Sequence, residues 1–293
     1  MRRFNTIKLY FSVYKNWLGV LFNTIIGTQN IKLVFRNGFV SRYPRDLRYV
    51  IANIVKSKIF KPSEINFDGP SGVLTLRYKE RTIRLKVLRD GIINADLSSF
   101  FGDYAFLEPL ENKEILDIGA NIGDSAIWFS IQGAMKVVAI EPYRFTYEIA
   151  EANIKENGLE NRIILINAGY GEDGFIELDD KQSTIGSKMI EYTGGLRTRL
   201  MSLKSLLEYC KQEDNSEILL KMDCEGCEYG IMKEPKEILR KFAKILIEYH
   251  DGYESLEEKL IQSGFKVTVS QPISYVDKTE KEYVQGYLRA ERN

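Results

Sequence analysis

The sequence contains only three cysteines and a single histidine among its 293 residues. Three cysteines are too few for the disulfide framework of a small secreted protein. The 41 basic side chains balance the 41 acidic ones, which argues against a surface built to bind nucleic acid. No run of 18 or more uncharged apolar residues occurs, so no membrane-spanning helix is expected. We expect a cytoplasmic protein, and the length of 293 residues permits one large domain or two smaller ones.

The first part of the chain combines apolar and basic side chains. Between Ile7 and Ile26 the apolar residues recur at helical spacing, which predicts a helix packed on the rest of the protein. The alternative is a helix that lies on a membrane surface, with its basic side chains facing anionic lipid. These side chains are Arg2, Arg3, Lys8 and Lys15. Residues 1–27 are therefore a candidate for peripheral membrane contact.

Residues 1–102 contain short alternating and helical patterns but no chemical motif. We expect a strand over 31–36, a helix over 44–58 that begins at its proline, and a hairpin formed by 73–78 and 82–87. This front third is predicted to be a small N-terminal α+β extension.

From Ile115 onward strands and helices alternate, which predicts a mostly parallel sheet covered on both faces. We expect an α/β domain over residues 103–293 with seven strands. The last two strands form a hairpin, so the seventh is expected to lie antiparallel in the sheet. The expected strands are 115–118, 136–140, 162–167, 217–222, 245–249, 265–269 and 283–288.

The stretch from Ile115 to Ser125 reads as a strand, a glycine turn and a helix, which is the opening of a nucleotide-binding unit. Gly119, Asn121 and Gly123 have a spacing that differs from the Gly-x-Gly-x-x-Gly of dinucleotide sites. Asp117 precedes the first glycine, and a carboxylate there suits a ligand with an ammonium group better than a pyrophosphate. S-adenosyl-L-methionine has an amino-acid end and a cationic sulfur, so it fits this site better than NAD does.

Further polar residues follow the other predicted strands, at the edge where open α/β sheets bind ligands. Glu141 follows the second strand, where an acidic residue can accept hydrogen bonds from both ribose hydroxyls. Ala168 follows the third strand and is expected to border the adenine. Asp124 and Asp223 complete the predicted cofactor contacts.

The acceptor is expected at the ends of the fourth and fifth strands. His250, the only histidine, is predicted to act as the base that deprotonates a hydroxyl, with Asp251 or Glu248 orienting it. Glu225 and Glu228 are three residues apart and would share a face at the start of a helix, where they are expected to bind acceptor hydroxyls or a metal. The sequence alone does not justify assigning a metal ligand.

Cys224 and Cys227 form a single Cys-x-x-Cys. Without a second pair or a histidine cluster this is poor evidence for zinc, and the context of a thioredoxin motif is missing. Both are interpreted as small, partly buried packing residues.

Four motifs together resemble the FkbM family of S-adenosylmethionine-dependent methyltransferases. They are Leu116–Asp124, Ala139–Pro142, Leu220–Glu228 and Ile247–His250. The resemblance covers about Asp103 to Val269 and implies a class I, Rossmann-like methyltransferase fold in which Asp117, Gly119 and Glu141 touch the cofactor. Family members mostly methylate oxygen on sugars, glycolipids or polyketide-like natural products. The resemblance thus implies O-methylation of a glycan, glycolipid or related small-molecule acceptor.

Other classes of function remain as alternatives. A non-catalytic binding module on the same fold would carry the same motifs. A nicotinamide oxidoreductase would need the phosphate-binding glycine pattern, which this turn lacks. A methyltransferase for nucleic acid is disfavoured by the neutral charge and by the lack of an Asn/Asp-Pro-Pro-aromatic strand end.

Overall fold

The computed structural model describes residues 2–89, 92–93, 102–178, 196–210, 216–276 and 282–292. The chain divides into two compact units, Met1–Gly102 and Asp103–Asn293. Across the described part of the chain, no helix is both long enough and apolar enough to cross a membrane.

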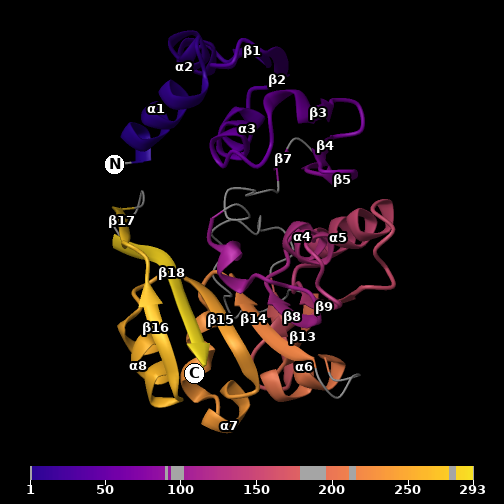
Figure 1. Ribbon diagram of the computed structural model, residues 1–293, viewed down its shortest axis with the longest axis vertical. Coiled ribbons are helices and arrows are strands. Elements are labelled where there is room, and N and C mark those ends of the chain that lie inside the picture. Colours follow the sequence, from indigo (N-terminus) through magenta and orange to yellow (C-terminus); the bar gives the residue numbers. More distant parts are fainter. Residues whose placement is uncertain are drawn as a thin grey trace. The chain divides into compact units, whose positions relative to one another are not determined.

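The first unit is an α+β unit (Figure 1). It contains the helices α1 (Arg2–Val13), α2 (Trp17–Ile25) and α3 (Leu47–Lys56) and the antiparallel pair β1 (Asn30–Val34) and β2 (Val40–Pro44). A second antiparallel sheet joins β3 (Ile65–Asp68), β4 (Val73–Tyr78) and β5 (Arg81–Lys86), preceded by the 3-10 helix η1 (Pro62–Glu64). The short strands β6 (Leu88–Arg89) and β7 (Ile92–Ile93) pair with each other.

Two helix predictions for this unit were wrong. The expected single helix before Ile26 is broken, because the residues between α1 and α2 form hydrogen bonds with strand β1. The amide of Lys15 donates to the carbonyl of Val34 at 2.6 Å, and the amide of Val34 donates to the side chain of Asn16 at 2.9 Å. The helix expected to begin at Pro44 begins at Leu47, because Pro44 is still paired with Asn30 in the β1–β2 ladder.

The second unit is built on a mostly parallel sheet with the strand order β10-β9-β8-β14-β15-β18-β16 (Figure 1). Its strands are β8 (Lys113–Ile118), β9 (Lys136–Ile140), β10 (Ile163–Ile166), β14 (Glu217–Met222), β15 (Phe242–Tyr249), β16 (Phe265–Val269) and β18 (Glu282–Arg292). The strands from β10 to β15 pair in parallel, whereas β18 is antiparallel to both β15 and β16. The mostly parallel sheet with an antiparallel last strand is therefore confirmed, although over the described residues the sheet has eight strands rather than the expected seven. Strand β17 (Ile273–Val276) pairs with β18 outside this order.

Helices connect these strands. They are η3 (Tyr104–Leu107), α4 (Asp124–Ile131), α5 (Arg144–Glu156), α6 (Leu203–Cys210), η4 (Cys227–Lys233), α7 (Lys236–Leu239) and α8 (Glu254–Gln262). Helix α6 begins after Ser202, whose Oγ accepts a hydrogen bond from the amide of Ser205 at 3.2 Å. A small side sheet joins β11 (Gly169–Tyr170), β12 (Gly174–Leu178) and β13 (Leu196–Met201).

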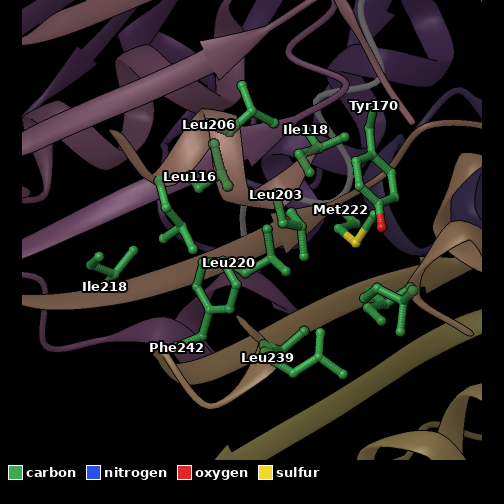
Figure 2. Packing of buried hydrophobic residues seen from close by; sticks show 14 of the residues in the cluster. Leu116, Ile118, Tyr170, Leu203, Leu206, Ile218, Leu220, Met222, Leu239 and Phe242 are labelled. Carbon is green, nitrogen blue, oxygen red and sulfur yellow. The ribbon is translucent and has the colours of Figure 1, made fainter. Parts of the chain in front are cut away.

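The central strands send alternate side chains to opposite faces of the sheet. On one face Leu116 of β8 and Leu220 of β14 pack with Leu203 and Leu206 of α6, as Figure 2 shows. The intervening residues, Asp117 and Lys221, therefore point to the other face. Strand alternation thus keeps the apolar core separate from the polar groups that the sequence singled out.

The turn after β8 requires a residue without a side chain. Gly119 has a φ of +80°, and a Cβ at this position would lie 1.9 Å from the carbonyl oxygen of Asp223. Gly123, also at +80°, lies so close to α5 that a Cβ would come within 3.2 Å of Ala150. Asn121 has a φ of 48°, which asparagine tolerates better than most residues. The ends of β8 and β14 can meet only because position 119 is glycine.

We predict that Gly119→Ala lowers the free energy of unfolding by ~3 kcal/mol or more, since it combines a backbone clash with left-handed strain. Gly158→Ala is the matched control, because Gly158 also has a positive φ of 65° but its Cβ would meet open space. The control should cost about 1 kcal/mol. Denaturant unfolding followed by circular dichroism measures both, and equal losses would contradict the close approach of Gly119 to Asp223.

Candidate functional site

A buried ion pair links the two central strands at the edge of the sheet where the site is expected. Asp117 and Lys221 are direct partners in the register between β8 and β14. Lys221 Nζ lies 2.9 Å from Asp117 Oδ1, and both side chains are almost completely buried. Ser125 Oγ donates to the other oxygen of Asp117 at 2.6 Å, and Lys221 also donates to the carbonyl of Gly119 at 2.8 Å. The ion pair therefore holds the strand ends and the glycine turn together.

Other acidic groups surround the same lysine. Burial lowers the pKa of Lys221, but the carboxylates of Asp117, Asp223 and Asp124 outweigh burial, so its pKa is raised and it stays charged. Burial raises the pKa of Asp124, at the start of α4, to about 7. One lysine thus faces three carboxyl groups. This excess of acidic groups favours the binding of a further positively charged group nearby.

The predicted contact between Asp117 and a ligand ammonium group remains a prediction. In the structure the Asp117 carboxylate is already bonded to Lys221 and Ser125. A ligand ammonium would have to displace Lys221 to reach it.

Glu141 follows β9 and anchors the glycine turn. Its Oε2 accepts a hydrogen bond from the amide of Asn121 at 3.0 Å, while Oε1 accepts from the amide of Tyr143 at 3.0 Å and from the hydroxyl of Thr146 at 2.8 Å. Burial raises the pKa of Glu141 to about 7, although these three donors oppose the shift. Oε2 carries only one of these three bonds, which leaves it capacity for a further donor.

Ala168, at the end of the third strand, was predicted to border the adenine, and this contact remains a prediction. Ala168 is fully buried within the apolar core, among residues such as Leu116 and Tyr170. It therefore presents no surface to an adenine ring in this structure. Its neighbour Asn167 donates to the carbonyls of Glu141 and Pro142 at 2.8 and 3.1 Å and so ties β10 to β9.

Two site residues were not singled out from the sequence. Lys221 was quoted within a strand motif but given no role, although a lysine in the apolar run Ile218–Met222 was a usable signal. Tyr104, in η3, is buried against Phe129 with ring centroids 5.1 Å apart, and its ring lies 6.0 Å from Lys221 Nζ. Burial and the charge of Asp223 raise the pKa of Tyr104 well above its usual range. No sequence pattern marks Tyr104.

The acceptor-side prediction needs correction at Glu228. It was expected to bind acceptor hydroxyls or a metal beside Glu225, but its side chain is fully buried. Glu228 Oε1 lies 2.9 Å from Nδ1 of His250, and Oε2 accepts from the amide of Gly226 at 2.8 Å. Glu228 therefore orients the imidazole, the role that the sequence gave to Asp251 or Glu248.

Asp251 and Glu248 have other contacts. Glu248 accepts hydrogen bonds from Gln285 and, at 2.7 Å, from the hydroxyl of Tyr287. The amide of Asp251 donates to the hydroxyl of Tyr229 at 2.7 Å. Burial raises the pKa of Glu248 to about 8, with Asp223 adding to the shift.

Asp223 and Glu225 approach the other side of the His250 ring. His250 Nε2 lies 3.9 Å from Asp223 Oδ1 and 3.7 Å from Glu225 Oε2. Burial lowers the pKa of His250, but the hydrogen bond to Glu228 and the charges of these carboxylates raise it to about 10. In the protein alone, His250 therefore carries a proton on both ring nitrogens at neutral pH.

The interpretation of the two cysteines was incomplete. Cys224 and Cys227 do pack against the apolar core, but they also form a disulfide, with Cα atoms 5.4 Å apart. The bridge encloses Glu225 and Gly226, both with positive φ, at 56° and 118°. Sequence reasoning placed Glu225 in a helical turn, whereas this left-handed pair turns it toward His250, and Glu228 lies in the first turn of the 3-10 helix η4, which begins at Cys227.

We predict that Lys221→Met destabilises the protein by about 3–5 kcal/mol, because it leaves the buried carboxylate of Asp117 without its cation. The double variant Lys221→Met, Asp117→Asn should lose less than the sum of the two single variants. Urea unfolding midpoints of the four proteins measure this coupling. Additive losses would show that the pair does not act as a unit.

We compared the sequence and the structure with those of known proteins. The Methyltransferase FkbM domain family matches residues 117–267. A search of curated proteins finds no significant match to the chain. Similar solved structures include the methyltransferase FkbM from Methylobacillus flagellatus KT, at 14% identity and a TM-score of 0.40 over 63% of this chain and 45% of that one.

Two further structures show comparable likeness. Precorrin-6y C5,15-methyltransferase from Geobacter metallireducens GS-15 is 14% identical, with a TM-score of 0.38 over 65% of this chain and 86% of that one. P. horikoshii TYW2 in complex with MeSAdo is 14% identical, with a TM-score of 0.38 over 96% of this chain and 84% of that one.

The family match spans more than half of the chain and includes Asp117, Glu141, Asp223 and His250. Its residues run from the end of β8 to β16, and so cover the glycine turn and the acidic strand ends described above. The chain therefore belongs to the FkbM methyltransferase family.

Proposed function

We propose that the protein transfers a methyl group from S-adenosyl-L-methionine to a hydroxyl group of a glycan, glycolipid or related small molecule. The observation that carries this proposal is the joint placement of Glu141 and the glycine turn, because the Glu141 carboxylate is bonded to the amide of Asn121 within that turn. The backbone of the glycine turn and the carboxylate of Glu141 are thus held together, at a position where a ribose can bind.

The residues present fit this cofactor at two points. Glu141 Oε2 has capacity for a ribose hydroxyl, and the excess of carboxyl groups around Lys221 favours a ligand with positive charge. When bound, S-adenosylmethionine would supply the electrophilic methyl group. The chain itself would hold the ribose at Glu141 and position the acceptor for an in-line approach.

The acceptor end lies where Asp223, Glu225 and His250 converge. The half-buried carboxylates of Asp223 and Glu225 can accept hydrogen bonds from acceptor hydroxyls. His250 remains our candidate for the group that acts on the reacting hydroxyl, with Glu228 fixing its ring. A proton can pass to Nε2 only when that nitrogen is unprotonated.

We predict that Glu141→Gln weakens S-adenosylmethionine binding about 10- to 100-fold, the loss expected for a hydrogen bond to a charged acceptor. Isothermal titration calorimetry measures the dissociation constant, and Glu160→Gln, an exposed glutamate, serves as the control. Unchanged affinity in Glu141→Gln would exclude the ribose contact.

The same assignment predicts a pH dependence. Burial raises the pKa of Glu141 to about 7, so below this pH the carboxyl is mostly neutral. It must lose that proton before Oε2 can accept a ribose hydroxyl at full strength. The affinity for S-adenosylmethionine should therefore rise between pH 6 and pH 8. In Glu141→Gln the affinity should increase less between pH 6 and pH 8, because the titrating carboxyl is gone. An equally large increase in the variant would show that another group causes the pH dependence.

We further propose that the first unit brings the enzyme to a membrane surface that carries its acceptor. Helix α1 buries Leu9, Tyr10 and Val13 within its own unit, so part of the helical stripe is core. Val20 of α2 is buried as well, but six other apolar side chains of α1, of α2 and of the residue that follows α2 are exposed, among them Ile25 at 82%. They are Ile7, Phe11, Leu18, Phe22, Ile25 and Ile26. Lys8 and Lys15 are exposed on the same segment and complement anionic lipid.

We expect the double variant Phe22→Ser, Ile25→Ser to reduce sedimentation with vesicles of phosphatidylcholine and phosphatidylglycerol several-fold, because it removes apolar area that would enter the interface. Both side chains are exposed, so the fold should survive, whereas deletion of the segment would remove core residues of the unit. Ile261→Ser, at an exposed position on α8, is the matched control. Equal sedimentation of all three proteins would refute the membrane contact.

A further inference from the structure

One nitrogen of His250 is buried without a partner. Nδ1 is used by Glu228, but Nε2 has no hydrogen-bond partner in the described part of the chain. The side chain is only 9% exposed. Leaving a buried polar atom unsatisfied is costly, so its occurrence in a cluster of charged groups indicates a ligand position.

The free nitrogen is directed at two carboxylates. Asp223 Oδ1 and Glu225 Oε2 lie 3.9 Å and 3.7 Å from Nε2, too far for hydrogen bonds. One donor atom from each of the three residues lies within 4.8 Å of the others. Ligands held at about 2.1 Å from a common ion are roughly 3–4 Å from one another. The two separations from Nε2 therefore match those of ligands that share one cation, and the third lies within 4.8 Å.

Glu228 gives the imidazole the orientation that a metal ligand needs. It is fully buried and lies 2.9 Å from Nδ1. When a cation displaces the proton from Nε2, the hydrogen bond from Nδ1 to this carboxylate leaves the lone pair of the neutral ring on Nε2, directed at the cluster. Histidines that bind metals generally donate their other N–H group to a carboxylate or a carbonyl in this way.

The charge balance also favours a cation. Asp223, Glu225 and Glu228 surround the ring, while the nearby Lys221 is already bonded to Asp117. Two carboxylate oxygens and one imidazole nitrogen form a mixed donor set that suits divalent ions such as Mn²⁺.

We propose that Asp223, Glu225 and His250 form a binding site for a divalent cation, with Glu228 as the positioning residue behind the imidazole. Three protein ligands leave coordination positions for the acceptor hydroxyl, which the cation would make more acidic. His250 Nε2 is then a ligand rather than the base. The role in acceptor activation rests on the proposed function, whereas cation binding does not require S-adenosylmethionine.

Electron paramagnetic resonance of free Mn²⁺, titrated into the metal-stripped full-length protein at one fixed pH, tests this site. We expect one bound Mn²⁺ per chain, with Asp223→Asn and Glu225→Gln each weakening binding about tenfold or more, the lower end of the losses seen when ligand support is removed. Both carboxylates are partly exposed, so these variants should fold, and circular dichroism checks that they do. Asp251→Asn, an exposed acid next to His250, is the matched control and should bind like the wild type.

Absence of Mn²⁺ binding to the wild type, or equal binding by all variants, would overturn the inference. Competition by Mg²⁺ and Zn²⁺ in the same titration ranks the ions that the site accepts. Calorimetry with S-adenosylmethionine on the same samples separates the two proposals. Site-specific Mn²⁺ binding without cofactor binding would support the cation site and contradict the proposed methyl transfer. Cofactor binding without Mn²⁺ binding would support the proposed methyl transfer and contradict the cation site.

Discussion

The geometry of the site depends on the buried ion pair between Asp117 and Lys221. The two residues face each other across β8 and β14, and Lys221 also reaches the first carbonyl of the glycine turn. Two charges removed from water in this way are costly unless they are paired and have further partners. Here Ser125 donates to Oδ2 of Asp117, and Lys221 donates to the carbonyl of Gly119. The pair thereby fixes the angle at which the glycine turn leaves the sheet and the direction in which the chain continues from β14.

A second buried carboxylate has the same function on the acceptor side. Glu228 bonds the amide of Gly226 and the ring of His250, and so connects the end of β14 to the end of β15. Neither Asp117 nor Glu228 faces open space. Asp223 and Glu225 are partly exposed and lie beside His250, whose ring is held by the inaccessible Glu228, whereas Glu141 is itself buried and offers only the remaining capacity of its Oε2. Such a division between supporting and contacting groups is expected where a site must keep its shape without bound ligand.

The sequence predicted the sheet well because its strands are apolar runs that end in polar residues. The positions of such strands can be read directly from the pattern of apolar and polar residues. It also identified the strand ends that converge, since parallel strands bring their carboxyl ends to one edge. It could not predict which acids point inward. Glu228 was assigned to the acceptor on helical spacing, but the left-handed backbone at Glu225 and Gly226 turns it toward the interior. Lys221 was overlooked because its partner depends on the register between strands far apart in the chain. Likewise, α1 and α2 are separate helices because β1 pairs with the residues between them.

The contact between Gly119 and the backbone of Asp223 has an evolutionary consequence. At position 119 the glycine turn lies directly against the backbone of Asp223, so no side chain stands between the turn and the end of β14 at this point. Side chains around the acceptor can then change in size or charge without shifting the turn. We therefore expect that substitutions around the proposed acceptor site can alter the choice of acceptor while the contact between position 119 and the backbone of residue 223 is kept.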